Sequence, residues 1–446
     1  MLKKISISNI LGLQIFQVMR FLAFLIISIV FTHTDLSKKD IGNFELLLFI
    51  ASAITFFWIT GIIQSLLPLF NNNQSFVLRP KDYKSPELFN AFVLITIISV
   101  FIALLGFIFK NNIQVYREAF PLPYATPLLL YILFSSPSCL VEYVYLLYNK
   151  ANHIIIYGLI SFTLQVFMVI LPIEAGYSID YGIWGLVVIS ILRFLWLLVL
   201  LKKYAIWKIS VNFIKEHLML ALPLMLSTLL SGSAQYIDGI IVSAKFSPEK
   251  FAIFRYGAKE MPLVTTLASG LNNAMLNQFS SIERVKFGLL TLKKRSLRLM
   301  HILFPISIIL LFLSDIIFPA LFTRRFGQSS DVFMVYVLLI ISRMVFPQTI
   351  LIGLKKNKVI MWVSIIEIIL NVGLTLLMIP RYGIVGVAVA TVIIFVLEKI
   401  ILIAYNYFKL DIRPDSYIPI GWYVFYSLFI TLIFILIDHR ILVVRL

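Results

Sequence analysis

Long apolar segments alternate with short polar ones along almost the whole chain. An apolar run of about 20 residues is long enough to cross the hydrocarbon core of a bilayer as a helix. The pattern predicts membrane helices near residues 10–31, 43–70, 88–109, 123–148, 153–173, 180–201, 216–245, 251–277, 299–322, 331–352, 360–380, 383–406 and 418–437. The polar segments between them are too short to fold as separate aqueous domains. The sequence therefore predicts an all-α, polytopic membrane protein.

The Lys and Arg residues of the polar segments indicate how the chain is inserted. Cytoplasmic loops of membrane proteins carry an excess of Lys and Arg. Here the segments on the side of the amino terminus are richer in these cations, above all the segment from Arg284 to Arg298. We therefore expect a multi-pass protein of the bacterial inner membrane with a cytoplasmic amino terminus. The first apolar run lacks a small-residue cleavage site, so no removable signal peptide is expected.

Composition narrows the classes of function. Hydrophobic residues make up 61% and charged residues 13% of the 446 residues, whereas a soluble domain has about 45–50% and about 25%. The net charge of +17 could suggest nucleic acid, but the cations lie in small groups between apolar runs and form no basic face. The single cysteine, Cys139, excludes an internal disulfide and a cysteine metal site. The five histidines have no metal spacing, so neither a metal nor a cofactor is expected.

The two halves of the chain share three short matches in the same order. Residues 36–44 match 246–254, residues 150–153 match 355–358, and residues 181–185 match 382–386. Each half would hold six spans and enter the membrane in the same direction, which places a ligand site between the halves. We predict two parallel six-helix lobes, 1–209 and 210–408, followed by an extra span and tail at 409–446.

Two motifs resemble those of a known family. The first is Leu36-Ser-x-x-x-Ile-Gly42-x-Phe44, and the second is Asn371-x8-Pro380-x2-Gly383-x2-Gly386-x-Ala388-x-Ala390-Thr391. With them, residues 5–405 resemble the polysaccharide-transporter branch of the multidrug/oligosaccharidyl-lipid/polysaccharide (MOP) superfamily, which includes the O-antigen flippases of the Wzx type. The resemblance implies V-shaped lobes like those of multidrug and toxin extrusion (MATE) transporters, alternating access and no catalytic residue.

The resemblance also implies a substrate. Members of this branch move a polyprenyl-diphosphate-linked oligosaccharide from the cytoplasmic to the outer leaflet, for the synthesis of O-antigen, capsule or exopolysaccharide. The expected partners are this lipid-linked oligosaccharide, membrane lipids and other membrane proteins of polysaccharide assembly. No nucleic acid is expected, and the sequence leaves the coupling cation, H⁺ or Na⁺, open.

Polar side chains on the predicted spans indicate a central cavity, because ionisable residues inside a membrane usually face a partner or a water-filled path. The predicted ligand-binding residues are Gln17 and Arg20 in the first span, Gln235 and Asp238 in the seventh, Arg255, Lys259 and Asn273 along one unbroken polar line of the eighth, and Arg343 in the tenth. Alternatively, Arg255 and Lys259 extend to the membrane interface. Arg343 could instead pair with Glu367 or Glu142, and we expect Arg193 to be structural.

The predicted cavity is rich in cations and amides, which suits an anionic, sugar-bearing ligand. Arginine and lysine would pair with a diphosphate, while amides would bind sugar hydroxyls. The alternative function within the superfamily is a MATE-type cation-coupled multidrug antiporter, because Asp238 would suit an organic cation. An alternative from another class is a membrane-embedded glycan polymerase or ligase, but the chain has no long outer loop for such chemistry.

Overall fold

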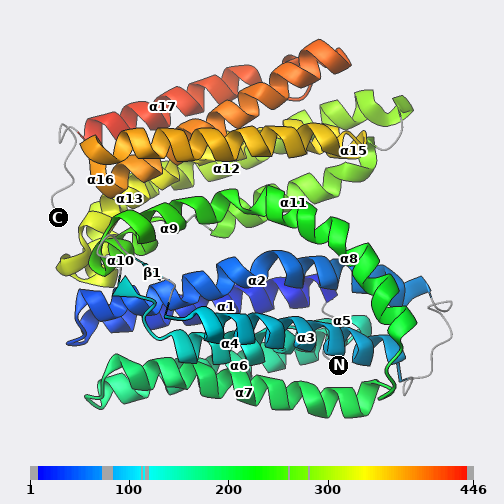
Figure 1. The fold of residues 1–446 in the computed structure, drawn as a ribbon. Helices are drawn as coiled ribbons and strands as arrows, with labels where there is room; N and C mark the ends of the chain where they lie inside the picture. Colours follow the sequence, from blue (N-terminus) through cyan, green and yellow to red (C-terminus); the bar gives the residue numbers. More distant parts are fainter. Residues whose placement is uncertain are drawn as a thin grey trace, which may run out of the picture. The chain divides into compact units, whose positions relative to one another are not determined.

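The computed structural model describes residues 9–72, 84–111, 114–115, 120–259, 262–279 and 282–438. This part of the chain is almost entirely helical (Figure 1), and its one pair of strands, β1 (Gln114–Val115) and β2 (Phe120–Pro121), is two residues long. The all-α prediction is confirmed. The chain divides into two compact units: unit 1 is Met1–Gly232 with Phe246–Glu249, and unit 2 is Ser233–Lys245 with Lys250–Leu446.

Unit 1 is built from long apolar helices. They are α1 (Asn9–His33), α2 (Lys38–Asn72), α3 (Pro86–Phe109), α4 (Ala125–Ser138), α5 (Leu140–Leu147), α6 (Ala151–Glu174), α7 (Ile179–Tyr204) and α8 (Val211–Gly232). Such apolar segments form helices in a bilayer because a helix satisfies its backbone N–H and C=O groups internally. The start of α3 has two typical signals, a Ser85 cap that accepts from the Leu88 N–H and a proline in the first turn.

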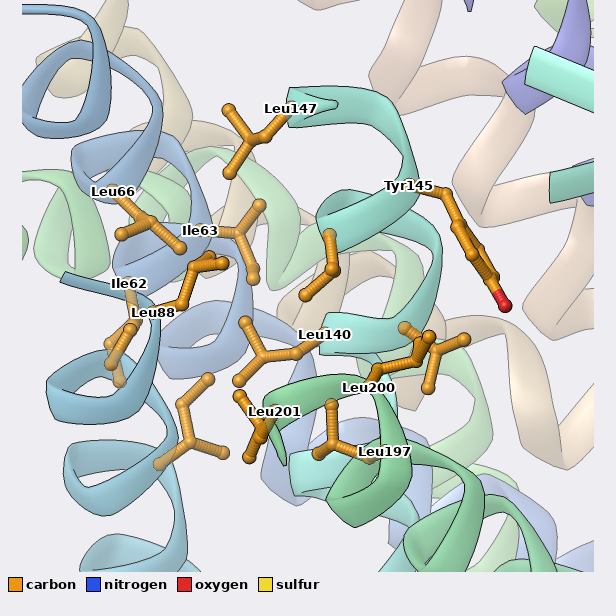
Figure 2. Close-up of a cluster of buried hydrophobic side chains, with 14 of the residues drawn as sticks. Ile62, Ile63, Leu66, Leu88, Leu140, Tyr145, Leu147, Leu197, Leu200 and Leu201 are labelled. Carbon is orange, nitrogen blue, oxygen red and sulfur yellow. The ribbon is translucent and has the colours of Figure 1, made fainter. Parts of the chain in front are cut away.

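The hydrophobic core of unit 1 lies where α2, α3, α5 and α7 meet, as Figure 2 shows. Ile62, Leu140 and Leu201 are completely buried there. The last helix, α8, packs along α2 at Gly61, where a Cβ atom would lie 2.8 Å from the backbone nitrogen of Met225. Small residues allow this close helix contact. The compact unit therefore extends to the end of α8, while the lobe boundary near residue 209 stays a prediction about the repeat.

Unit 2 contains two very long helices and several short, interrupted ones. They are α9 (Ala234–Lys245), α10 (Pro248–Gly257, from Lys250 onward in this unit), α11 (Pro262–Met275), η1 (Leu276–Phe279), α12 (Ile282–Phe322), η2 (Arg324–Phe326), α13 (Gln328–Val337), α14 (Ile340–Arg343), α15 (Pro347–Gly353), α16 (Asn357–Leu410), η3 (Pro414–Ser416) and α17 (Ile420–Asp438). Its core is formed by residues of α11, α12, α13, α15 and α17, among them the completely buried Met300 and Ile350.

Four predicted spans are not single helices, and the one predicted at 123–148 consists of α4 and α5. The span predicted at 216–245 consists of α8 and α9, that at 251–277 contains α10 and α11, and that at 331–352 contains α13, α14 and α15. The last has a bend of 48° before Pro347, where proline lacks the N–H that would continue the helix. Among the described residues, ten helices are long and apolar enough to cross a membrane, or eleven if this bent pair counts as one span.

The 54-residue helix α16 is bent back on itself at Gly383. A straight helix of this length would measure about 80 Å, far more than the ~30 Å bilayer core. Gly383 has φ 58° and ψ −135°, which is not helical. The side chains of Asn371 and Thr391 are hydrogen-bonded at 3.2 Å, although 20 residues of straight helix would separate them by about 30 Å. The spans predicted at 360–380 and 383–406 therefore lie side by side, and the six-plus-six arrangement stays a prediction.

One loop occurs in the same form in both units. Asn149 before α6 and Lys355 before α16 have left-handed backbones, with φ 54° and 58°. The next N–H in each loop donates to a carbonyl five residues earlier, from Lys150 to Tyr145 and from Lys356 to Leu351, both at 2.8 Å. This is a common way to close the end of a helix. In the structure Asn149 therefore corresponds to Lys355, and Lys150 corresponds to Lys356. The sequence match, which paired residue 150 with 355, is wrong by one position, because the two loops have the same backbone conformation but different residues at equivalent positions.

Candidate substrate and cation site

A buried carboxylate, Asp238 of α9, lies at the centre of a polar network in unit 2. Its side chain is only 5% exposed. Its Oδ2 atom accepts hydrogen bonds from the Tyr336 hydroxyl of α13 and from the Thr391 hydroxyl of α16, each at 2.6 Å. Burying a charged group is costly unless it is hydrogen-bonded. Hydroxyl donors from two other helices therefore stabilise this carboxylate within the unit.

The network continues along both arms of α16. The Thr391 oxygen accepts from the Asn371 amide at 3.2 Å, and the Asn371 carbonyl oxygen accepts from Thr375 at 3.3 Å. All three side chains are buried. Carboxylate, amide and hydroxyl oxygens together can hold a proton or a small monovalent cation, since hard cations prefer oxygen ligands. Among the described residues, no group of three or more His, Cys, Asp and Glu residues lies together as a metal site.

Two of the predicted cations line one small pocket of unit 2. Its lining includes Lys259, Ser307, Tyr336 and Arg343, together with apolar residues of α11, α13 and α14. The Lys259 ammonium lies 5.0 Å from the centre of the Tyr256 ring, and the Arg343 guanidinium lies 5.0 Å from the centre of the Phe395 ring. Aromatic rings attract cations in this way. Two cationic residues in a mostly apolar lining suit an anion.

Arg343 also lies in the electrostatic field of a second buried cluster. The Glu367 carboxyl is 8% exposed. It interacts electrostatically with Glu398, Lys399 and Arg343. Lys399 lies 2.8 Å from the Glu398 carboxylate and donates to Gln348 of α15 at 3.2 Å. Of the two acids expected as alternatives for Arg343, Glu367 is therefore the one in its field. This places Arg343 between the pocket and the α16 cluster.

In unit 1, Arg20 and Arg193 both act on one buried acid. Arg20 is exposed on α1. The Glu142 carboxyl is 5% exposed and interacts electrostatically with both Arg20 and Arg193. Arg193 of α7 donates to the Gln165 carbonyl oxygen at 2.8 Å and to the backbone carbonyl of Ser161 at 3.2 Å. These bonds join α7 to α6, as expected for a structural arginine.

The other predicted site residues are more scattered. Gln17 is exposed on α1, Gln235 is exposed in the first turn of α9, and Arg255 is partly buried on α10. Asn273 belongs to α11, but its side chain lies outside the described part of the chain. The prediction of one unbroken polar line along a single eighth helix is wrong. α10 ends at Gly257, and α11 begins at Pro262, whose ring cannot follow a helical turn without a clash.

The network contains uncharged polar residues that are not among the predicted ligand-binding residues. Tyr336 is uncharged and lies in a largely apolar segment, so no local pattern distinguishes it. Asn371 and Thr391 did carry a signal, because they are the first and last residues of the second family motif. The bend at Gly383 brings the two ends of that motif into contact.

The sequence profile of a protein family matches this chain over residues 36–331, more than half of its length. The description of that family is polysaccharide biosynthesis protein. The chain belongs to this family. Membership of the polysaccharide biosynthesis family confirms the resemblance that the two motifs indicated. A comparison with curated protein sequences gives no match.

Solved structures with the same fold are membrane transporters and flippases. The lipid II flippase MurJ in its inward closed conformation has a TM-score of 0.64 at 16% identity, over 96% of this chain and 93% of that chain. An inward-facing MATE multidrug transporter has a TM-score of 0.62 at 14% identity, over 91% and 98%. A MOP superfamily transporter from Pyrococcus furiosus has a TM-score of 0.55 at 14% identity, over 91% and 94%. The fold is therefore that of these transporters and flippases, and the helices of the described residues are those of a multi-pass membrane protein.

Proposed function

We propose that this polysaccharide biosynthesis protein is a flippase for a polyprenyl-diphosphate-linked oligosaccharide. It would move this substrate from the cytoplasmic to the outer leaflet of the bacterial inner membrane, with its amino terminus in the cytoplasm, for O-antigen, capsule or exopolysaccharide. The observation that carries the proposal is the pocket of unit 2, whose lining residues include Lys259 and Arg343 together with Ser307 and Tyr336. Two cations in an apolar protein favour an anion such as a diphosphate.

The roles of the side chains follow from their chemistry. The planar Arg343 guanidinium can donate two parallel hydrogen bonds to a phosphate, and Lys259 acts as a compact point charge. Arg20 and Arg255 are proposed as further cations on the substrate path. The amides of Gln17, Gln235 and Asn273 are proposed to bind sugar hydroxyls. Transport needs no covalent step, and the two halves would alternate in opening to each side.

The Asp238 network is proposed to bind the coupling cation. A buried carboxylate inside a membrane protein is a functional candidate by default, and here it is held by the hydroxyls of Tyr336 and Thr391. The same carboxylate favours one alternative function, a MATE-type antiporter of organic cations. The two cations of the neighbouring pocket argue against that alternative, because they would repel a cationic drug.

Ligand binding separates the two functions. Purified protein in nanodiscs should bind a radiolabelled lipid-linked oligosaccharide saturably and should not bind the cationic dye ethidium. Each charge-assisted contact contributes about 1.5–3 kcal/mol, so Lys259→Ala with Arg343→Ala should weaken binding by about 100-fold or more. Arg381→Ala is the matched control, since Arg381 is an exposed cation of α16 beside Tyr382. Saturable ethidium binding without lipid binding would favour the antiporter and contradict the flippase.

A further inference from the structure

We propose that the Tyr336 hydroxyl couples the charge of Asp238 to the affinity of the anion pocket. This inference rests on the proposed function of that pocket. Among the described residues, Tyr336 belongs to both sites. It lines the pocket with Lys259 and Arg343, and its hydroxyl donates to the Asp238 carboxylate. A phenol has one O–H donor, so the hydroxyl cannot serve the carboxylate and an anion in the pocket at the same time.

The geometry holds the tyrosine between the two sites. Its hydroxyl lies 2.6 Å from Asp238 Oδ2, while its side chain is 9% exposed and forms part of the pocket wall. The Phe254 ring packs against the Tyr336 ring edge-on, with the ring centres 6.2 Å apart. The ring is therefore fixed by packing, and rotation of the O–H bond is its remaining freedom.

A second donor at the same oxygen makes release of the hydroxyl possible. Thr391 also donates to Asp238 Oδ2 at 2.6 Å, and the Thr391 oxygen is itself held by the Asn371 amide. If Tyr336 turns away, the carboxylate keeps the threonine bond. Thr391 is not among the residues that line the pocket, so it cannot reach an anion there. The two hydroxyls thus have different roles on one carboxylate.

The Tyr336 hydroxyl proton can therefore take two orientations. With Asp238 ionised and no cation bound, the Tyr336 O–H points at the carboxylate and its lone pairs face the pocket, which disfavours a phosphate. When a proton or a monovalent cation neutralises Asp238, the Tyr336 O–H turns to a phosphate oxygen between Lys259 and Arg343. The phenol keeps its own proton throughout, and the neutralising charge comes from the bound cation. Cation binding therefore raises anion affinity, and the anion raises cation affinity by the same factor.

A double-mutant cycle tests the coupling with one probe, radiolabelled farnesyl diphosphate, and the full-length protein in nanodiscs. Asp238→Asn imitates the neutralised carboxylate at nearly equal volume. It should tighten binding by about tenfold, within the range usual for coupled sites. Tyr336→Phe removes the hydroxyl and keeps the ring. In the Tyr336→Phe background, Asp238→Asn should tighten binding by less than about threefold, because only the loss of a nearby negative charge remains.

The cycle cancels the contribution of the surrounding charges. The other charged side chains on the elements that pack around Tyr336 include Arg255, Lys259, Asp315, Asp331, Arg343, Glu367, Glu398 and Lys399, and all four proteins contain them. Thr391→Val is the matched control, since it removes the second donor to the same oxygen without touching the pocket. In that background Asp238→Asn should still tighten binding by about tenfold.

The outcomes separate this inference from the function on which it rests. Equal tightening by Asp238→Asn with and without the Tyr336 hydroxyl would overturn the inference and show simple charge repulsion. Loss of the effect in Thr391→Val instead of Tyr336→Phe would also overturn it. If the wild-type protein binds no diphosphate, or if Lys259→Ala and Arg343→Ala leave binding unchanged, the proposed function itself fails. Size-exclusion profiles and melting temperatures of the four proteins verify that each variant is folded.

Discussion

The buried ionisable side chains of unit 1 and unit 2 can be compared directly, because each unit contains deep cations and an acid that is 5% exposed. In unit 1 the acid is Glu142, which lies in the field of two arginines. In unit 2 the acid is Asp238, which is held by two neutral hydroxyls. The two arginines offset only part of the cost of burying the Glu142 carboxylate, because burial outweighs their charges. The Asp238 carboxylate is stabilised by hydroxyl donors, and it can exchange such bonds for contacts with a bound cation.

The deep cations differ in the same way. Arg193 in unit 1 is bonded to two groups of the neighbouring helix α6, so its charge is used in packing. Lys259 and Arg343 in unit 2 line a pocket. A charged residue inside a membrane protein is therefore not by itself evidence of a binding site. Its contacts separate a structural role, as for Arg193, from the binding role that we propose for Lys259 and Arg343.

The largest expected effect concerns Arg20, an exposed cation of α1 in unit 1. Arg20→Ala should abolish surface polysaccharide while the protein inserts normally, if Arg20 contacts the substrate. Arg20→Lys should retain part of the activity, because it keeps the charge without the planar guanidinium. Surface glycan is measured in a deletion strain that carries each variant, with immunoblots of the membrane fraction.

A second substitution sharpens this test. If Arg20 only balances the charge of Glu142, then Glu142→Gln should restore export in the Arg20→Ala strain. Such a rescue, or full surface glycan in Arg20→Ala itself, would contradict a role of Arg20 in binding. Continued loss of export in the double variant is the expected result.

Arg193→Ala should destabilise unit 1 and spare binding. Removal of the guanidinium leaves the buried Gln165 carbonyl without its donor, and an unsatisfied buried group costs about 1–3 kcal/mol. Thermal unfolding in detergent should show the loss of stability, while the affinity for farnesyl diphosphate should stay within about twofold of wild type. Arg343→Ala should instead weaken farnesyl diphosphate binding and leave the thermal stability close to that of wild type. Equal loss of binding in both variants would remove the distinction between the units.

The bend of α16 offers a test of similar size within unit 2. Gly383→Ala should destabilise the protein by about 1–3 kcal/mol, because its φ of 58° with ψ of −135° is strained for a residue with a Cβ atom. Gly373 lies in the same helix, and a Cβ there would have no atom within 4 Å. Gly373→Ala should instead stabilise by about 0.5–1 kcal/mol. Equal effects of the two substitutions in thermal unfolding would show that the bend needs no glycine.

The smallest expected effect concerns the loop that both units share. Lys355→Gly should raise stability by up to about 1 kcal/mol, since the left-handed conformation is costly for lysine and free for glycine. Asn149→Gly should give a smaller gain in stability, because asparagine tolerates the left-handed conformation. The substitution also removes the hydrogen bond that Asn149 Oδ1 accepts from the Asn9 amide at 2.6 Å. Thermal unfolding of both variants measures the difference. A larger gain at Asn149 would mean that the two loops are not equivalent.

Much of the helical structure follows from the sequence alone, because the bilayer constrains it locally. A run of about 20 apolar residues must satisfy its backbone internally, and only a helix does so within one segment. The starts of α2 and α10 and the bend at Gly383 also coincide with motif positions that are visible in the sequence. The family could be inferred from the same positions, because glycine permits backbone conformations that other residues avoid, and proline fixes φ.

The candidate site needed the tertiary structure, because its contacts join residues far apart in the chain. Asp238 meets Tyr336 and Thr391 only when α9, α13 and α16 pack together, and no local pattern marks an uncharged tyrosine as their link. The break between Gly257 and Pro262 likewise decides that Lys259 belongs to a pocket rather than to a polar line on one helix. Hydrophobic length is a local property and can be read in sequence. Hydrogen bonding between helices depends on which faces meet, and packing of the whole unit decides that.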